Sequence, residues 1–467
     1  MAMGAGLAQA VLRVPERPIH PVRYQRIFLL VGMLLAGVQA YTARYYMGAD
    51  GISYVDVALA YVRHDWSLAV SSYWSPMYSW VLGLGFAIVP VTPRTEYPIV
   101  HAVNWICFVF TFWRFHRFWQ TLTERSNEMD GSDISLVQEN PSLWDTLGYG
   151  LFLYLFVPLV ATVTPDLLAA GFVFLIAEQA LKLGTNAFLP GKVSTRSMAL
   201  AGAYLAKSIL LYLGFGVLLV ALLLRIGNRR VIASCLVFFI ALSGSWVFVL
   251  HHFYGKWTVG ASGGLNYAWF VNGTETGFVL DPQGPSMPYF SGEKAPTVPP
   301  VFRVQTHPNV TFIPWFDPAR FDPSRKPTFS LGHQVSALSK NLRWLRGWFL
   351  IEFGPITVVC LGVLFTSGRG TLSRLKSMVV VLAPVAGLFG LYALVFVRSY
   401  RYIAAPTILL YAVLFSVGSS QRVRATTKAG FVLAGLLIFA AANLPGTIKV
   451  CCPNHQTQRR KLPRLKF

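Results

Sequence analysis

Charged residues are scarce in this sequence, and negatively charged ones are particularly rare. Asp, Glu, Lys and Arg make up 13% of the 467 residues, with 19 acidic side chains against 40 basic ones. Hydrophobic residues account for 54% of the chain, and the mean hydropathy is +0.51. Ordinary soluble domains contain about 25% charged residues, so this balance excludes that class. Much of the chain must therefore be surrounded by an apolar environment.

Cysteine is also scarce, and the usual nucleotide-binding motifs are missing. The five cysteines have neither metal-ligand spacing nor the pattern of a disulfide framework, so we assign no chemistry to them. No Gly-rich phosphate loop or Walker pattern occurs, which argues against an ATP-driven pump. The first 25 residues lack the apolar core of a cleaved signal peptide, so we expect the first apolar run to be an uncleaved anchor.

Long apolar runs are what the sequence has in abundance. Crossing a bilayer core of about 30 Å takes about 20 apolar residues in a helix. The sequence therefore predicts an all-α polytopic membrane protein with roughly ten transmembrane helices. The expected spans are residues 26–46, 97–119, 147–163, 167–183, 197–224, 231–250, 344–365, 378–397, 402–417 and 431–444.

The excess of positive charge, formally +21, follows a membrane pattern rather than a nucleic-acid-binding one. Short Lys and Arg clusters lie between the apolar runs, and such clusters mark cytoplasmic helix ends. This rule divides the chain into an N-terminal membrane region (1–250) with a first outer loop (47–96), an extracytoplasmic loop (251–343), C-terminal membrane helices (344–447) and a basic tail (448–467). The side of the tail is left open.

Three segments depart from a simple helix-per-span pattern. Residues after Gly48 have apolar side chains at helical spacing, which predicts a short amphipathic helix on the outer surface. The apolar stretch 76–91 is short for a span, and we expect it to be interfacial or re-entrant. Residues 197–224 are too long for one untilted span and contain Lys207 near the middle, which predicts a broken helix or a hairpin.

Two carboxylates are expected at the outer boundary of the membrane. Asp50 follows the first span, and Asp166 lies in the tight turn Thr164-Pro165-Asp166 between two spans. Either residue has a structural interpretation, because acids and Thr commonly cap helices and stabilise helix N-termini. Together, beside a long outer loop, they could bind and deprotonate a hydroxyl or amine nucleophile. Asp56 lies on another helical face and is the weaker candidate.

Three basic residues are candidates for contact with a phosphate. Lys207 is costly in the middle of an apolar run, by about 3 kcal/mol on insertion scales, so it should face protein or water. It either binds a lipid phosphate or pairs with an acid in the folded chain. Arg398 and Arg401 lie at an outer helix end, where they could clasp a phosphate or anchor the interface. No metal site is supported by the histidines.

Several short motifs, in chain order, resemble those of the C-type glycosyltransferase superfamily. The chain is similar to its bacterial RgtA/B/C/D-like and protein mannosyltransferase-like branch. The residues on which this rests are Asp50-Gly-Ile-Ser-Tyr54-Val-Asp56, Trp74-Ser-Pro-Met-Tyr78, Thr164-Pro165-Asp166, Ala203-Tyr-Leu-Ala-Lys207 and Arg401-Tyr402-Ile-Ala-Ala-Pro406. Ala49 and Gly51 flank Asp50, so the paired acidic motif of the mannosyltransferases is missing, which leaves the acceptor type and the use of a divalent metal open.

The resemblance implies a function. Such enzymes use a sugar linked through phosphate to a polyprenol, and transfer it to a glycan, lipid or protein acceptor on the outer side of a bacterial cytoplasmic membrane. The lipid-linked sugar is a substrate, and no cofactor is implied. Asp50 would be the base, Asp166 would orient the acceptor or sugar, and Lys207, Arg398 or Arg401 would contact the phosphate. Tyr54 and Asp56, in the first motif, would be substrate-binding residues.

Two other functional classes remain compatible with the sequence. A transporter or flippase of a lipid-linked saccharide would also use a broken helix with a central lysine, although no inverted repeat is visible. A membrane acyltransferase would call for an intramembrane catalytic histidine, for which His101 is the nearest candidate. Binding of a lipid phosphate beside Asp50 and Asp166 would favour the transferase.

Overall fold

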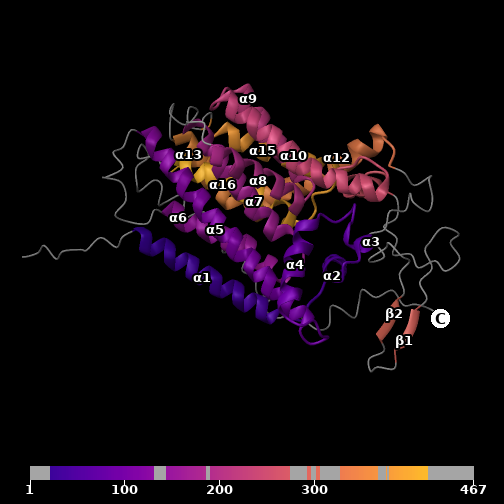
Figure 1. Cartoon of the computed structure of the whole chain (residues 1–467). Coiled ribbons are helices and arrows are strands. Elements are labelled where there is room, and N and C mark those ends of the chain that lie inside the picture. Colours follow the sequence, from indigo (N-terminus) through magenta and orange to yellow (C-terminus); the bar gives the residue numbers. More distant parts are fainter. Residues whose placement is uncertain are drawn as a thin grey trace, which may run out of the picture.

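A computed structural model gives the architecture of the chain as a bundle of helices (Figure 1). It describes residues 21–130, 143–185, 190–273, 292–295, 301–304, 327–366, 375 and 378–418. The structure agrees with the expected all-α membrane class. The one β-element in this part is an antiparallel pair of short strands, β1 (Gly292–Ala295) and β2 (Val301–Val304).

The first half of the bundle comprises α1 to α9. Their bounds are α1 Pro21–Thr42, α2 Ala49–Val62, α3 Trp66–Ala69, α4 Pro76–Ile88, α5 Glu96–Asp130, α6 Leu143–Phe156, α7 Asp166–Leu181, α8 Pro190–Ala206 and α9 Leu210–Leu223. The remaining elements are α10 Arg229–Tyr254, α11 Ser262–Phe270, α12 Leu331–Gly347, a π-helical turn Trp348–Glu352, α13 Gly354–Thr366, α15 Val379–Val395 and α16 Tyr400–Gly418.

Four described helical segments are long and apolar enough to cross a membrane. They are Gln25–Thr42, Glu96–Ser126, Trp144–Ala161 and Arg229–Tyr254. Several further apolar helices have 10–17 residues, which at 1.5 Å per residue is short for a 30 Å core. The apolar helices agree with an integral membrane protein. The expected span at 431–444 lies outside the described residues.

One face of α1 exposes a row of apolar side chains, which indicates contact with lipid rather than with water. Leu30, Leu34 and Val38 recur at helical spacing and remain 55–61% exposed in the folded chain. The opposite face of α1 packs on α5, where Trp105 donates a hydrogen bond from its indole Nε1 to the Met33 carbonyl, at 3.0 Å. Figure 1 shows α1 alongside α5 at the edge of the bundle. The exposed apolar stripe is therefore the lipid-facing side.

The expected break in residues 197–224 is confirmed. Helix α8 ends at Ala206 and α9 begins at Leu210, so Lys207 lies in the three-residue break between them. The two helices pack on each other and on α10, which makes the pair a hairpin rather than one bent span. A lysine at a helix end is less costly than one inside a helix, because its backbone and side chain both reach polar partners.

Three elements differ from the sequence prediction. Helix α5 continues to Asp130 instead of ending at Trp119, because its polar last turns are held by protein, as where the Ser126 hydroxyl donates to the Ser416 carbonyl. Helix α2 is enclosed on several sides rather than lying on the surface, and packs on α4. The expected span 344–365 is bent by 79° between Glu352 and Gly354.

Hydrogen bonds hold the segment around the end of α10 against the rest of the helical bundle. Gly255 ends α10 in the left-handed conformation, and the chain returns toward the α8–α9 break. The Tyr254 hydroxyl donates to the Val70 carbonyl at 2.6 Å, and the Tyr204 hydroxyl donates to the Val259 carbonyl at 2.9 Å. The Ser208 and Ser262 hydroxyls are 3.1 Å apart. Helix α11 thus begins directly beside Lys207.

Candidate active site

Asp50 and Asp166 both occupy the first turn of a helix. Gly48 is the N-cap of α2 and Pro165 is the N-cap of α7, and neither helix has a side-chain cap bond. The interpretation of Asp50 as the N-cap of α2 is therefore wrong, and so is that of Thr164 as the N-cap of α7, whereas Asp166 lies near the helix N-terminus as expected. An acid in a first turn still interacts favourably with the positive end of the helix dipole. The fold thus places two carboxylates at the N-terminal ends of two separate helices.

The structure brings these two acids together with two of the expected basic residues. Arg401, in the first turn of α16, places Nη2 2.8 Å from Asp50 Oδ2 and Nε 3.7 Å from Asp166 Oδ2. Lys207 Nζ lies 2.5 Å from Asp166 Oδ1. We call Asp50, Asp166, Lys207 and Arg401 the four-charge cluster. Its members come from α2, α7, the α8–α9 break and α16.

The four-charge cluster is neutral overall, but its members are unequally enclosed. The Asp166 side chain is 4% exposed and contacts both cations, whereas Asp50 is 18% exposed and contacts Arg401 alone. Lys207 and Arg401 are each 21% exposed. Asp166 is therefore the inner anchor that holds the two cations side by side. Asp50 is an outer member attached by one ion pair.

Aromatic rings surround the cations. Lys207 Nζ lies 4.2 Å from the ring centre of Tyr402, which stacks on Tyr392 at 5.5 Å with an interplanar angle of 10°. Arg401 also donates from Nη2 to the Tyr402 hydroxyl at 2.9 Å. Such cation–π and hydrogen-bond contacts fix the direction of both side chains. The sequence contained the pair Arg401-Tyr402, but no role for either tyrosine was inferred from it.

Tyr54 lies between the cluster and the core. Its side chain is 4% exposed and its ring meets those of Trp74 and Tyr78 at centroid distances of 4.6 and 5.1 Å. Its hydroxyl is close enough to Asp50 and Asp166 to interact with both electrostatically. The structure thus gives Tyr54 a packing role at the base of the cluster, and its contact with a substrate stays a prediction.

Tyr73 and Asn266 border the cluster, and sequence reasoning did not single them out. Tyr73 interacts electrostatically with Asp50 and Arg401, and the Asn266 side chain hydrogen-bonds its hydroxyl. The Tyr73 ring also contacts Trp269 on α11 at a centroid distance of 6.3 Å. These residues lie in irregular or short elements far apart in the sequence, so no spacing pattern could have joined them. Helix α11 therefore forms one wall of the site.

Two expected site residues are not brought into the cluster. Arg398 is exposed, and in the described part of the chain it forms no ion pair with either acid of the cluster. Asp56 is half-buried on another face of α2, near Glu96 and Arg63. Burial raises the pKa of Asp56 to about 6, Glu96 adds to the rise, and Arg63 opposes it. A role of either residue in binding substrate remains a prediction.

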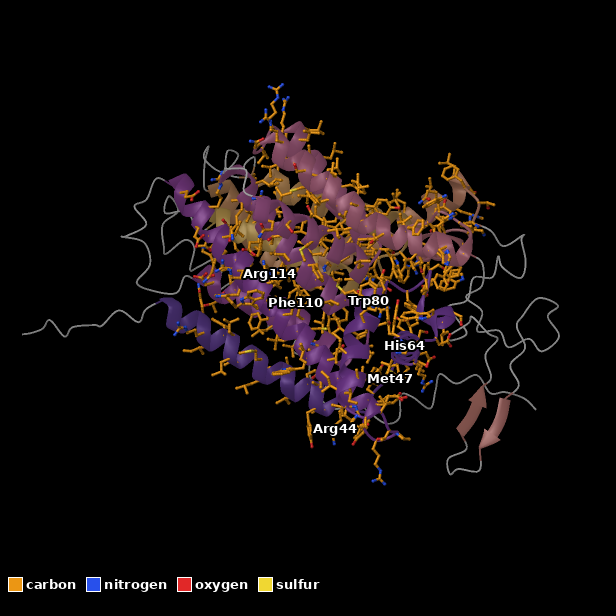
Figure 2. All side chains as sticks on the ribbon, in the orientation of Figure 1. Arg44, Met47, His64, Trp80, Phe110 and Arg114 are labelled. Carbon is orange, nitrogen blue, oxygen red and sulfur yellow. The ribbon has the colours of Figure 1, made fainter. Side chains whose placement is uncertain are left out.

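A second buried ion-pair group lies farther along the same helices. Arg114 on α5 pairs with Glu178 on α7, and Lys182 Nζ lies 2.5 Å from Glu178 Oε1. Figure 2 shows Arg114 farther along α5, away from Arg44 and Met47 near the end of α1. Glu178 pairs with both Arg114 and Lys182, and its pair with Arg114 links α5 to α7. We assign this group to helix packing.

The described residues were compared with the ligand sets that hold metal ions. No group of three His, Cys, Asp or Glu side chains that could hold a metal ion occurs in residues 21–418 where the structure describes them. Both acids of the four-charge cluster have cationic partners within 4 Å. His101, considered above for acyl transfer, is 1% exposed and its Nε2 lies 2.8 Å from the Tyr46 carbonyl. It holds the end of α1 rather than facing the cluster.

The fold of this helical bundle has counterparts among solved structures. Two solved structures share it, both of ArnT from Cupriavidus metallidurans, one bound to undecaprenyl phosphate and one in the apo state. Their TM-scores are 0.53 and 0.52. Each alignment covers 93% of this chain at 13% identity.

The similarity to the ArnT structures is one of fold only. At 13% identity it concerns the fold, and this chain spans 66% of the length of the ArnT chain. No protein-family model matches the sequence, and neither does any curated protein. The fold expected from the order of the short motifs is therefore the one found. Activity, substrate and acceptor must be argued from the site itself.

Proposed function

We propose that this protein is a membrane glycosyltransferase that transfers a sugar from a polyprenyl-phosphate donor to an extracytoplasmic acceptor. The observation that carries the proposal is the four-charge cluster, in which the partly exposed Asp50 lies beside Arg401, and the buried Asp166 holds both Arg401 and Lys207. A carboxylate can accept the proton of a nucleophile, and cations stabilise a departing phosphate. The fold shared with ArnT, which has been solved with undecaprenyl phosphate bound, supports a lipid phosphate as the ligand.

The proposed reaction is a single displacement at the anomeric carbon of the donor. The acceptor hydroxyl or amine attacks that carbon, and a new bond to it forms while its bond to the phosphate oxygen breaks. The electron pair of the broken bond leaves with the polyprenyl phosphate. The proton of the nucleophile passes to the Asp50 carboxylate and then to water. Neither an oxidant nor a nucleotide is needed.

Each member of the cluster then has a separate task. Asp50, the more exposed acid, accepts the proton. Arg401 and Lys207 stabilise the negative charge on the phosphate, and the planar guanidinium suits two phosphate oxygens at once. Asp166 keeps both cations in place, since it contacts each of them from a buried position. The surrounding tyrosines limit the water that reaches the cations.

A flippase of lipid-linked saccharides is the second candidate, and the α8–α9 break favours it. Broken helices with a charged residue in the break are typical of transporters, and Lys207 lies in such a break. The two candidates differ in what Asp50 does. A flippase needs phosphate contacts but no proton acceptor, whereas the transferase needs both.

Replacing Asp50 by Asn tests the proposal. The substitution keeps the size of the side chain and removes the proton acceptor, so transfer should fall by about 10²-fold to 10⁴-fold. Transfer would be followed with labelled polyprenyl-phosphate sugar in membranes that contain the native acceptor. Asp65→Asn is the matched control, because Asp65 is exposed and lies outside the cluster. Near-normal turnover by Asp50→Asn would exclude Asp50 as the base.

A further inference from the structure

The ion pair between Asp50 and Arg401 is too short for both residues to perform their proposed tasks at the same time. Their oxygen and nitrogen atoms are 2.8 Å apart. In a displacement, the base oxygen lies about 3 Å from the nucleophile, which in turn approaches the anomeric carbon at about 3 Å. The leaving oxygen is on the far side of that carbon. A base and a cation that serve one reaction must therefore be well over 5 Å apart.

The structure consequently contains a closed arrangement of the cluster, in which a carboxylate takes the place that a phosphate would need. We propose that the Asp50 carboxylate occupies the phosphate site on Arg401 when no donor is present, and that the phosphate of a polyprenyl-phosphate ligand displaces it. The proposal rests on the function proposed above. It adds that Asp50 competes with the phosphate for Arg401 before it acts as the base.

Burial decides which of the two acids is displaced. Asp166 is 4% exposed and contacts both Lys207 and Arg401, so its removal would leave two cations without their anchor. Asp50 is 18% exposed and has a single cationic partner in the cluster. Water can hydrate the Asp50 carboxylate when it separates, which keeps the cost of separation low. The exchange therefore takes place at Asp50.

Arg401 stays in place while its partner changes. Its Nε faces Asp166 at 3.7 Å, and Nη2 donates to the Tyr402 hydroxyl at 2.9 Å. These contacts do not involve Asp50, so they persist when the carboxylate leaves. Two oxygens of a phosphate match the guanidinium at least as well as one carboxylate oxygen does. The released carboxylate can then accept a hydrogen bond from the hydroxyl or amine of the acceptor.

The exchange also orders the reaction. Before the donor binds, Asp50 Oδ2 is engaged by Arg401 Nη2 at 2.8 Å and is not available to a nucleophile. After the phosphate takes Arg401, the carboxylate is free to face the acceptor. Donor binding thus prepares the base, and an acceptor without a donor meets an engaged Asp50. The cluster itself stays neutral, and together with the singly charged phosphodiester of the donor it carries one net negative charge.

The test measures the affinity of the purified full chain for undecaprenyl phosphate in detergent micelles. Removing the competing carboxylate should strengthen binding, so Asp50→Asn and Asp50→Ser should each lower Kd by about twofold to fivefold. Asp65→Asn should leave Kd unchanged, and Arg401→Gln should weaken binding. A thermal unfolding scan of each variant shows which are folded. If Asp50→Asn does not fold, the comparison of Kd is made with Asp50→Ser.

The outcomes separate this inference from the proposed function. A wild-type chain that binds undecaprenyl phosphate, with Asp50 variants that bind it equally or more weakly, overturns the exchange and leaves the phosphate site in place. A wild-type chain that does not bind undecaprenyl phosphate overturns both the exchange and the proposed donor class. Tighter binding together with loss of sugar transfer by Asp50→Asn supports both proposals. If Asp50 had a purely structural role, its replacement would not increase the affinity for the phosphate.

Discussion

Asp166 is the residue on which the four-charge cluster depends for its stability. It is 4% exposed and pairs with Lys207 and Arg401. Removing one partner of a buried ion pair costs about 3 to 5 kcal/mol, because the remaining charge is left without compensation. We therefore expect Asp166→Asn to lower the midpoint of thermal unfolding in detergent markedly, while Asp50→Asn changes it little.

A double substitution provides the control for Asp166. In Asp166→Asn with Lys207→Met, one of the two stranded cations is also removed, so part of the lost stability should return. The two effects should be non-additive, since the residues are 2.5 Å apart. Equal unfolding midpoints for Asp166→Asn and wild type would contradict the buried ion pair.

Asp56 leads to a prediction about pH. Burial first, and then Glu96, raise its pKa to about 6, above the usual value of 3.8. The folded state therefore holds a proton more tightly than the unfolded state, and Asp56 lowers stability progressively as pH rises from about 4 to above 6. Asp56→Asn removes this penalty, so it should raise the unfolding midpoint at pH 7.5, with the gain vanishing near pH 4.

The measurement is a thermal unfolding series across that pH range in detergent. Asp65→Asn is the control, because Asp65 is exposed on the segment that follows α2. A gain for Asp56→Asn that is the same at pH 4.5 and 7.5 would show that it has another origin, such as helix propensity.

At this scale the sequence could identify the acids but not their partners. Asp50 and Asp166 could be inferred because each follows or begins an apolar run at the same boundary. The pairing of Asp50 with Arg401 joins residues 351 positions apart, and no local pattern encodes it. Arg398 was as good a candidate as Arg401 by sequence, because only the orientation of the first turn of α16 separates them.

Helix α11 is the element whose placement matters most for access to the site. The hydroxyls of Ser208 in the α8–α9 break and Ser262 at the start of α11 are 3.1 Å apart, and the Ala261 amide donates to the Ser72 carbonyl at 2.6 Å. Side chains at this separation can be bridged by a disulfide with little backbone movement. Ser208→Cys with Ser262→Cys should therefore form a disulfide on mild oxidation.

The bond would be detected as thiol labelling that appears only after reduction. The experiment uses a background with Cys451 and Cys452 replaced by Ser, and the other three native cysteines are buried, so background labelling should be low. Each single variant is the control. Persistent labelling of the double variant under oxidising conditions would mean that α11 does not lie against the break. Recovery of transfer upon reduction would further indicate that α11 must move for turnover.

Individual elements differed in how well sequence predicted them. The break around Lys207 was predictable, because a central lysine and an excessive length both conflict with one membrane span. The extension of α5 to Asp130 was not, since its last turns are polar and owe their place to contacts such as that of Ser126 with α16. The 79° bend before α13 likewise has no signal in hydropathy.

The orientation of the whole molecule in the membrane can be determined by cysteine labelling. The basic clusters predict that α11 lies outside and the polar end of α5 inside. In a background with Cys451 and Cys452 replaced by Ser, a cysteine at Gly263 should react with an impermeant maleimide in intact cells. A cysteine at Glu124 should react only after permeabilisation. Both positions are exposed.

The reverse labelling pattern would place the four-charge cluster on the cytoplasmic side and would contradict an extracytoplasmic acceptor. Hydropathy and charge could predict the class of the molecule and the order of its helices because the bilayer constrains both. They could not give the number of full crossings. Several apolar helices, such as α9 and α15, are too short to be counted by length, and neighbouring helices decide how deep they lie.

The distribution of the cluster along the chain has a consequence for biosynthesis. Asp50, Asp166 and Lys207 emerge from the ribosome first, and together they carry one uncompensated negative charge. Arg401 follows Asp50 by 351 residues, which at about 5 to 20 residues per second means a delay of roughly 20 to 70 s. During that interval the Asp50 carboxylate has no guanidinium to pair with inside a growing apolar bundle. A chain interrupted before α16 would keep this acid without Arg401 as its partner.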